Sequence, residues 1–172
     1  MAYSSPSYIS PGPGTANQIV LTLDIADSVT DITQSAAITI AGLQNITMNA
    51  ANDVFTWTQL DSTAKKQVAT TSTNSLSMNL VVDDSLFFGT TLASTVTDTA
   101  AAQGLLGMSR NKTLINFILK FVEGGSNQAT ADRFIKGTGY ITGLAPTVSA
   151  DSPVWVTPVT ITVTGEYTVA AT

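Results

Sequence analysis

The sequence contains no cysteine and no histidine. Without cysteine the chain cannot form disulfides, thiolate zinc sites or thiol nucleophiles. Without histidine it has no imidazole base, and a Ser-His-Asp triad is excluded. Because these two absences remove several common hydrolytic and metal-dependent chemistries, we expect a protein that is not an enzyme and that uses no metal or organic cofactor.

Charge is also scarce, since only 11% of the residues are Asp, Glu, Lys or Arg, against about a quarter in an ordinary domain. Seven basic residues stand against twelve acidic ones, which gives a formal net charge of -5. An acidic chain is not attracted to phosphate backbones, so we expect no specific binding of double-stranded DNA. A surface with so few charges indicates that other subunits cover much of it. The alternative is a Ser/Thr-rich monomer that stays soluble.

The first 16 residues, MAYSSPSYISPGPGTA, are rich in Pro, Gly and Ser. This composition predicts an extended arm over residues 1–16, followed by a single β-rich domain over residues 17–172. The arm has neither the basic nor the apolar region of a signal peptide, so we expect synthesis in the cytoplasm. No run approaches the ~20 apolar residues of a membrane helix, and no membrane contact is predicted.

Apolar and polar residues alternate along most of the chain, which is the period of a half-buried β-strand. In the clearest case Val159, Ile161 and Val163 share one face, while threonines occupy the other. Threonine keeps β propensity without charge, which suits a strand face that contacts another protein. Strands are predicted at about residues 19–25, 35–49, 53–60, 66–74, 76–82, 113–122, 132–144 and 159–164.

One segment, TDTAAAQGLLG from Thr97, predicts a short helix instead. Thr97 or Asp98 would cap its start and Gly107 would close it. We expect this helix to pack on the strands through Leu105 and Leu106. The predicted fold class is therefore mainly β: a two-sheet β-sandwich or partial barrel of antiparallel strands with one short α-helix.

The stretch FIKGTGYITG, residues 134–143, raises the possibility of a glycine loop that cradles phosphate. A dinucleotide fingerprint needs a third glycine where Thr142 stands, and it needs a helix to follow. Prolines and alternating β-branched residues follow instead, so we predict a strand. Its glycines either relieve curvature and admit close backbone contact, or are ordinary strand glycines beside a turn.

Three further groups of residues are candidates for catalysis or binding. Asp83 and Asp84 are adjacent, hence on opposite faces of an extended chain, whereas glycoside hydrolysis needs converging carboxylates, so we expect a strand end and a loop there. Trp57 and Trp155 would form a sugar-stacking platform in a carbohydrate-binding β-sandwich, or would anchor a core or an interface. The pair Lys65-Lys66 is too short a basic run for nucleic-acid binding.

Four segments, in order, resemble one known family. They are DVFTWTQLDSTAKKQVATTSTNSLSMNL, DTAAAQGLLG, LINFILKFVEGG and RFIKGTGYITGLAPTVSADSPVWVTPVTITVTGEYTV. Together they make the chain similar to the major tail tube proteins of tailed bacteriophages, a family shared with the tube of type VI secretion. The resemblance implies stacked hexameric rings in which strands join a ring-shaped sheet, forming a conduit for the genome.

The resemblance also implies binding partners and a location for the protein. Besides further copies of the chain, these are a tape measure protein, a baseplate, a tail terminator, a sheath protein if the tail is contractile, and double-stranded DNA in transit. The protein would reside in the virion tail after assembly in the host cytoplasm. The alternatives are a tail terminator, a capsid decoration protein, or the carbohydrate-binding β-sandwich.

Two sets of residues are expected to act in such a tube. The polar loop 59–67 and the arm would make contacts between rings, with Gln59, Leu60, Asp61, Lys65 and Lys66 as candidates. Carboxylates on or beside strands would line the lumen and repel phosphates, with Asp24, Asp132 and Glu166 as candidates.

Overall fold

The structure is a computed structural model that describes residues 19–26, 37–40, 43–60, 64–92, 95–121, 133–149 and 152–171. The predicted arm, residues 1–16, lies outside these ranges and stays a prediction. The elements are β1 (Ile19–Ile25), β2 (Ile38–Ile40), β3 (Leu43–Thr58), β4 (Lys65–Val81), α1 (Asp84–Phe88), α2 (Ala100–Arg110), β5 (Ile115–Phe121), β6 (Arg133–Leu144), β7 (Thr147–Ser149) and β8 (Ser152–Ala171).

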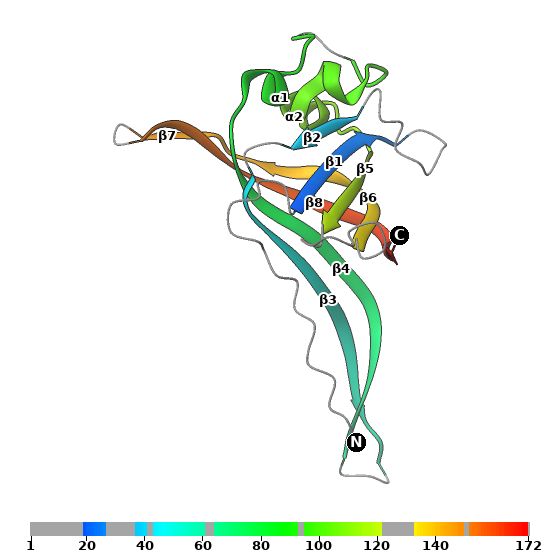
Figure 1. Cartoon of the computed structure of the whole chain (residues 1–172). Helices are drawn as coiled ribbons and strands as arrows, with labels where there is room; N and C mark the ends of the chain where they lie inside the picture. The colour runs from blue at the N-terminus through cyan, green and yellow to red at the C-terminus, as the bar shows by residue number, and fades with distance from the viewer. Residues whose placement is uncertain are drawn as a thin grey trace, which may run out of the picture.

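All described strands belong to one antiparallel sheet with the order β2-β1-β5-β6-β8-β4-β3, and β7 pairs with β8 (Figure 1). The mainly β class is confirmed, but the strands do not separate into two sheets. The reason is the length of β8, which has 20 residues. Its residues 156–162 pair with β4 and its residues 159–171 pair with β6, so the two halves of the fold stay hydrogen-bonded to each other.

The sheet curves around one hydrophobic core, which the two helices help to close. Apolar side chains from β1, β4, β5 and β8 meet Leu105 and Met108 of α2 in a single cluster. The side chains in it that are fully inaccessible to solvent are Leu21, Leu23, Leu76, Leu80, Ala100, Leu105, Met108, Ile115 and Ile161. Burial of this continuous apolar surface is the main favourable contribution to folding.

The helices differ from the prediction in number and in bounds. A first helix, α1, was not predicted, because its five residues are too few to show a helical period. In α2 the N-cap is Thr99, whose hydroxyl accepts a hydrogen bond from the Ala102 amide at 3.3 Å. The helix also runs past Gly107 to Arg110. Leu105 is buried as expected, whereas Leu106 is 39% exposed and does not join the core.

The strands follow the predicted periodicity, but several bounds differ. The single strand predicted over residues 35–49 is wrong, because β2 pairs with β1 at one edge of the sheet and β3 pairs with β4 at the other. Residues 43–58 form one strand where a break was expected near residue 50, and residues 65–81 form another where a break was expected near residue 75. Each is held continuous by pairing with the other along almost its whole length. Within the run LINFILKFV the residues Ile115–Phe121 form a strand, as predicted.

The glycine-rich stretch is also a strand, and close contacts explain two of its glycines. A Cβ on Gly139 would lie 2.4 Å from the Thr162 carbonyl oxygen, and one on Gly137 would lie 2.8 Å from the Phe117 ring. Register shifts interrupt the β6–β8 pairing on either side of Gly139, between Lys136 and Thr138 and between Ile141 and Gly143. The interpretation that these glycines admit close contact is therefore confirmed for Gly137 and Gly139, whereas a role in relieving curvature stays a prediction.

A pair of glycines also fixes the contact between the helices. Gly104 has φ 61° and ψ -178°, a conformation almost restricted to glycine, and a Cβ there would lie 2.3 Å from the Gly89 amide nitrogen. Gly165 also has a positive φ, of 78°, but a Cβ there would meet nothing within 4 Å. An alanine at position 104 would therefore suffer both backbone strain and a clash, whereas an alanine at position 165 would suffer backbone strain alone.

We expect Gly104→Ala to lower the free energy of unfolding by about 3 kcal/mol or more, because strain and overpacking add. Gly165→Ala is the matched control and should cost about 1 kcal/mol. Urea denaturation of dilute, unassembled protein measures both. Equal losses for the two variants would show that the Gly89–Gly104 contact does not hold the helices together.

Candidate functional site

The β3–β4 hairpin projects far from the core as a two-stranded ribbon (Figure 1). Within the described residues, β4 residues 65–74 pair only with β3, and residues 51–58 and 65–73 are exposed to solvent. An isolated two-stranded hairpin is at best marginally stable in water. No other described element pairs with this part of the ribbon, so pairing within the hairpin alone is not expected to stabilise it.

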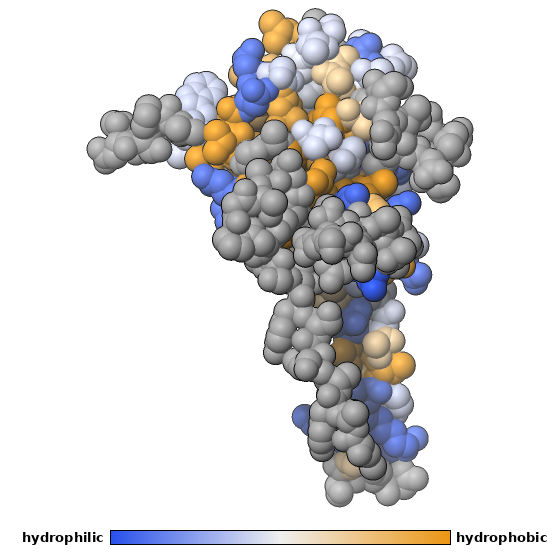
Figure 2. Space-filling model, in the orientation of Figure 1, coloured by the Kyte–Doolittle hydropathy of each residue, from blue (hydrophilic) through white to orange (hydrophobic). Residues whose placement is uncertain are grey.

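The end of the ribbon carries an aromatic face. Phe55 and Trp57 stack with ring centroids 5.9 Å apart and an interplanar angle of 24°. Val68 lies opposite Phe55 on β4, and these three side chains, which we call the aromatic tip, are 59%, 36% and 48% exposed in the order Phe55, Trp57, Val68. Figure 2 shows apolar side chains exposed on the projecting ribbon. Exposed aromatic side chains of this kind are typical anchors of protein interfaces.

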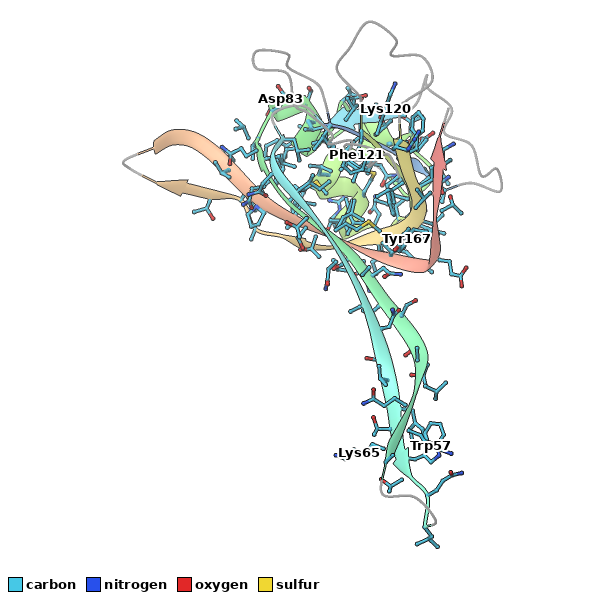
Figure 3. The ribbon with its side chains drawn as sticks, turned by 60° about the horizontal axis from the view of Figure 1, so that its bottom comes forward. Trp57, Lys65, Asp83, Lys120, Phe121 and Tyr167 are labelled. Atoms are coloured by element: carbon cyan, nitrogen blue, oxygen red, sulfur yellow. The ribbon has the colours of Figure 1, made fainter. Side chains whose placement is uncertain are left out.

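The predicted inter-ring residues gather at the same end. The Lys66 ammonium donates a hydrogen bond to the Gln59 side-chain oxygen, Leu60 is fully exposed, and Lys65 begins β4. Figure 3 shows Trp57 and Lys65 together at the ribbon end, remote from Asp83 and Lys120. Asp61 lies outside the described residues. The structure thus brings four of the five candidates to one place.

A second surface lies on the face of the sheet opposite the core. Because side chains alternate along each strand, the residues between the core positions of β3, β4, β6 and β8 all point to this face. From β3 and β4 they are Asn45, Thr47, Asn49, Ser75, Ser77 and Asn79. From β6 and β8 they are Tyr140, Thr142, Pro158, Thr160 and Thr162. We call this surface the polar wall.

Every side chain of the polar wall except that of Pro158 carries a hydroxyl or an amide, and none carries a charge. All are exposed or half-buried. Some of their polar groups are satisfied within the wall: the Thr142 and Thr162 hydroxyls lie 2.8 Å apart, and the Asn45 side-chain oxygen accepts a hydrogen bond from the main-chain amide of Asn79 at 3.0 Å. The wall is hydrophilic but electrically neutral.

The structure forms neither of the two sites considered from the sequence, the pair of catalytic carboxylates and the sugar-stacking platform. Asp83 caps α1 and Asp84 is its first residue, so this pair starts a helix and not the predicted loop. Trp57 lies on the ribbon end and Trp155 on β8, where its carbonyl oxygen accepts from the Val82 amide, so the two do not form one platform. In the described ranges no group of three acidic side chains is placed to hold a metal ion. The helices of the described residues are too short or too polar to cross a membrane.

No protein-family profile and no curated protein sequence matches the chain. Its structure, however, is similar to several solved ones. A chain of the SPP1 tail tube superposes with a TM-score of 0.60 at 10% identity, over 91% of this chain and 79% of that chain. A chain from the tail of an empty gene transfer agent (GTA) particle with C6 symmetry gives 0.58 at 15% identity, over 88% and 96%.

The chain has the fold of tail tube subunits. A further similar structure, from the sheath/tube terminator of an extracellular contractile injection system, has a TM-score of 0.54 at 11% identity and covers 94% of this chain and 99% of that chain. The tail-tube fold therefore agrees with the resemblance stated from the sequence. At these identities the similarity establishes the fold, and the function is argued below.

Within this tail-tube fold the carboxylates predicted to line the lumen differ in their exposure to solvent. Asp24 is only 6% exposed and its carboxylate accepts a hydrogen bond from the Ile25 amide at 2.8 Å, a position that does not suit a residue lining a passage. The strand pairing of β1 with β5 buries it. Glu166 is exposed in the irregular part of β8 opposite β6. Asp132 lies outside the described residues.

The sequence did not identify the aromatic tip or the polar wall as surfaces. The alternation in VFTWT placed Phe55 and Trp57 on one face of a strand, but nothing in it showed that this strand leaves the core. The alternation in β4 and β8 likewise placed Ser77 with Ser75 and Thr160 with Thr162. Only the β4–β8 register joined them into one wall.

Asp83 has a defined structural role in this tail-tube fold. Hydrogen bonds from the Ser85 hydroxyl, at 2.6 Å, and from the Leu86 amide, at 3.1 Å, hold the pKa of the Asp83 carboxyl below its usual value. A carboxyl whose pKa is depressed by folding stabilises the fold above its unfolded pKa, and this contribution is lost as the pH falls through the folded pKa.

We therefore expect Asp83→Ala to lower stability at pH 7, and we expect the difference from the wild type to shrink below about pH 4. Thr99→Ala, which removes the uncharged cap of α2, is the control, and its effect should not change with pH. Thermal unfolding between pH 7 and pH 3 measures both. A deficit of Asp83→Ala that persists undiminished at pH 3 would contradict this role.

Proposed function

We propose that this chain is the structural subunit of a tail tube, in which six copies form a ring and rings stack into a hollow conduit that delivers double-stranded DNA. The observation that carries the proposal is the β3–β4 ribbon, a two-stranded element with exposed faces that needs another subunit to be stable. The tail-tube fold and the low charge support it. The role is structural and no catalysis is proposed.

Ring closure would use the edges of the sheet. The order of strands leaves β2 at one edge and the long β3 at the other, and an open edge presents unpaired amides and carbonyls. Strands of neighbouring subunits would continue the sheet around the ring, which removes these edges. The similar GTA tail has C6 symmetry, in keeping with six subunits per ring.

Contacts between rings would use the ribbon end. The aromatic tip supplies apolar surface, while Gln59, Leu60, Lys65 and Lys66, with Asp61 beside them in the sequence, surround it with polar and basic groups. Each copy carries a net charge of -5, so basic side chains at a projecting end would meet acidic neighbours. The arm, residues 1–16, would add to these contacts.

The remaining partners follow from the same proposal. They are a tape measure protein, a baseplate and a tail terminator, with a sheath protein if the tail is contractile, and DNA that passes without specific binding. The protein would assemble in the host cytoplasm and reside in the virion tail.

A tail terminator is the second candidate, because a sheath/tube terminator is among the similar structures. A terminator stops at one ring, whereas a tube subunit continues to stack. A capsid decoration protein has no structural observation in its favour. The carbohydrate-binding β-sandwich is disfavoured because Trp57 and Trp155 lie on separate elements.

The purified protein should form rings with six-fold symmetry that stack into tubes, either alone or on a template. Negative-stain electron microscopy over a range of protein and salt concentrations checks this expectation. Single rings that never stack would favour the terminator. Protein that stays monomeric at high concentration would count against both candidates.

The double variant Phe55→Ser/Trp57→Ser should fold normally and form subunits or single rings, but tube growth should fall at least about tenfold, because hot-spot aromatics carry ≥ 2 kcal/mol at interfaces. Val54→Ser is the matched control. Val54 is 53% exposed on the same strand but on the face opposite Phe55. Tube growth followed by light scattering measures both. Equal growth of the double variant and the control would exclude the aromatic tip from the contact.

A further inference from the structure

The polar wall is the only side of the β4–β8 sheet, within the described residues, on which no other element packs. On the opposite side Leu76 and Leu80 of β4 and Ile161 of β8 are fully buried. They share one cluster with Leu105 of α2 and Phe117 of β5. The helices and the β1–β2–β5 part of the sheet therefore all lie on the core side of β4 and β8.

This one-sided distribution of mass decides how such a sheet can close into a ring. The inner circumference of a ring is shorter than the outer one, so the bulky side of each subunit fits outside and the thin side fits inside. Here the thin side is the polar wall, because among the described residues only side chains of the sheet itself stand on it. The outside then carries the helices.

The chemistry of the wall agrees with a passage for a polyanion. Lysine or arginine would bind phosphates and release counterions, which holds DNA in place. Among the described residues the stretch 67–81 of β4 and the stretch 137–144 of β6 have no charged residue. Lys136, which follows the alternation of Tyr140 and Thr142, lies beyond the register shift at the edge of the wall. Hydroxyls that already hydrogen-bond to each other, such as those of Thr142 and Thr162, gain little by exchanging that partner for a phosphate.

We propose that the polar wall lines the lumen and lets DNA pass because it is uncharged and internally hydrogen-bonded. This inference rests on the proposed tube and names the surface that meets the DNA. It replaces the acidic wall expected from the sequence, since Asp24 is buried by the β1–β5 pairing and the wall itself has no carboxylate. Passage then depends on the absence of strong contacts and not on charge repulsion.

The absence of cysteine makes a direct test possible, because one introduced cysteine is the only thiol in the chain. Thr162→Cys and Ser77→Cys place it on the wall, and Ser77→Cys is the more conservative second variant. Thr91→Cys, at an exposed position in the connection between α1 and α2, is the exterior control. Tubes of each variant, first verified by electron microscopy, are treated with N-ethylmaleimide or with a maleimide on a polyethylene glycol too large to enter the tube.

Wall cysteines in tubes should react with N-ethylmaleimide and not with the large reagent, whereas the exterior control should react with both. All variants should react with both reagents once the tubes are dissociated. Wall cysteines that react with the large reagent in tubes would place the wall outside. Wall cysteines that react with neither would place it in a contact between subunits, and either result overturns the inference while leaving the tube itself established.

A second experiment tests the chemistry of the wall. Thr162→Lys tubes incubated with short double-stranded DNA at low salt should retain at least about tenfold more nuclease-resistant DNA than wild-type tubes, and salt should release it. DNA bound by Thr91→Lys tubes should stay open to nuclease. Equal nuclease-resistant retention by the wild type and Thr162→Lys would overturn the inference. If the wild type forms no tubes, it is the proposed function that fails.

Discussion

The antiparallel pairing of β4 with β8 is the interaction on which the rest of the structure depends. Its register sets Leu76 against Ile161 and Ser77 against Thr160, so one face is apolar and the other is polar. A shift of one residue would exchange the two faces and expose the core. The same pairing also joins the ribbon strand β4 to the body of the subunit, because β4 continues without interruption from the core into the ribbon.

The ribbon shows how the energetics of folding and of assembly are linked. Where β4 pairs with both β3 and β8 its apolar side chains are buried, and where it pairs with β3 alone nearly all side chains are exposed. The chain therefore folds around its core and leaves a long two-stranded element that, in the proposed tube, a neighbouring subunit would stabilise. Low charge lowers the electrostatic cost of bringing many acidic copies together, which suits repeated self-association.

Each face of the sheet then has a separate role. The core face holds the helices, whose contact is fixed by Gly89 and Gly104 and whose ends are capped by Asp83 and Thr99. The polar wall on the opposite face carries no charge, and no other described element packs on it. In the proposed tube these two properties place the mass outside and a neutral hydroxyl surface inside, so assembly and passage follow from a single amphipathic sheet.

The sequence by itself determined the mainly β class, nearly all strand positions, the second helix and the lack of cysteine and histidine chemistry, because alternation and composition are local properties. It also placed Thr160 and Thr162 on one face, and it singled out the residues at the ribbon end. Tertiary structure alone decided that the strands form one sheet, that Asp24 is buried, that the two tryptophans are apart and that the hairpin leaves the core. A period of two shows which side chains share a face, but which face is covered depends on the register and curvature set by strands distant in the chain.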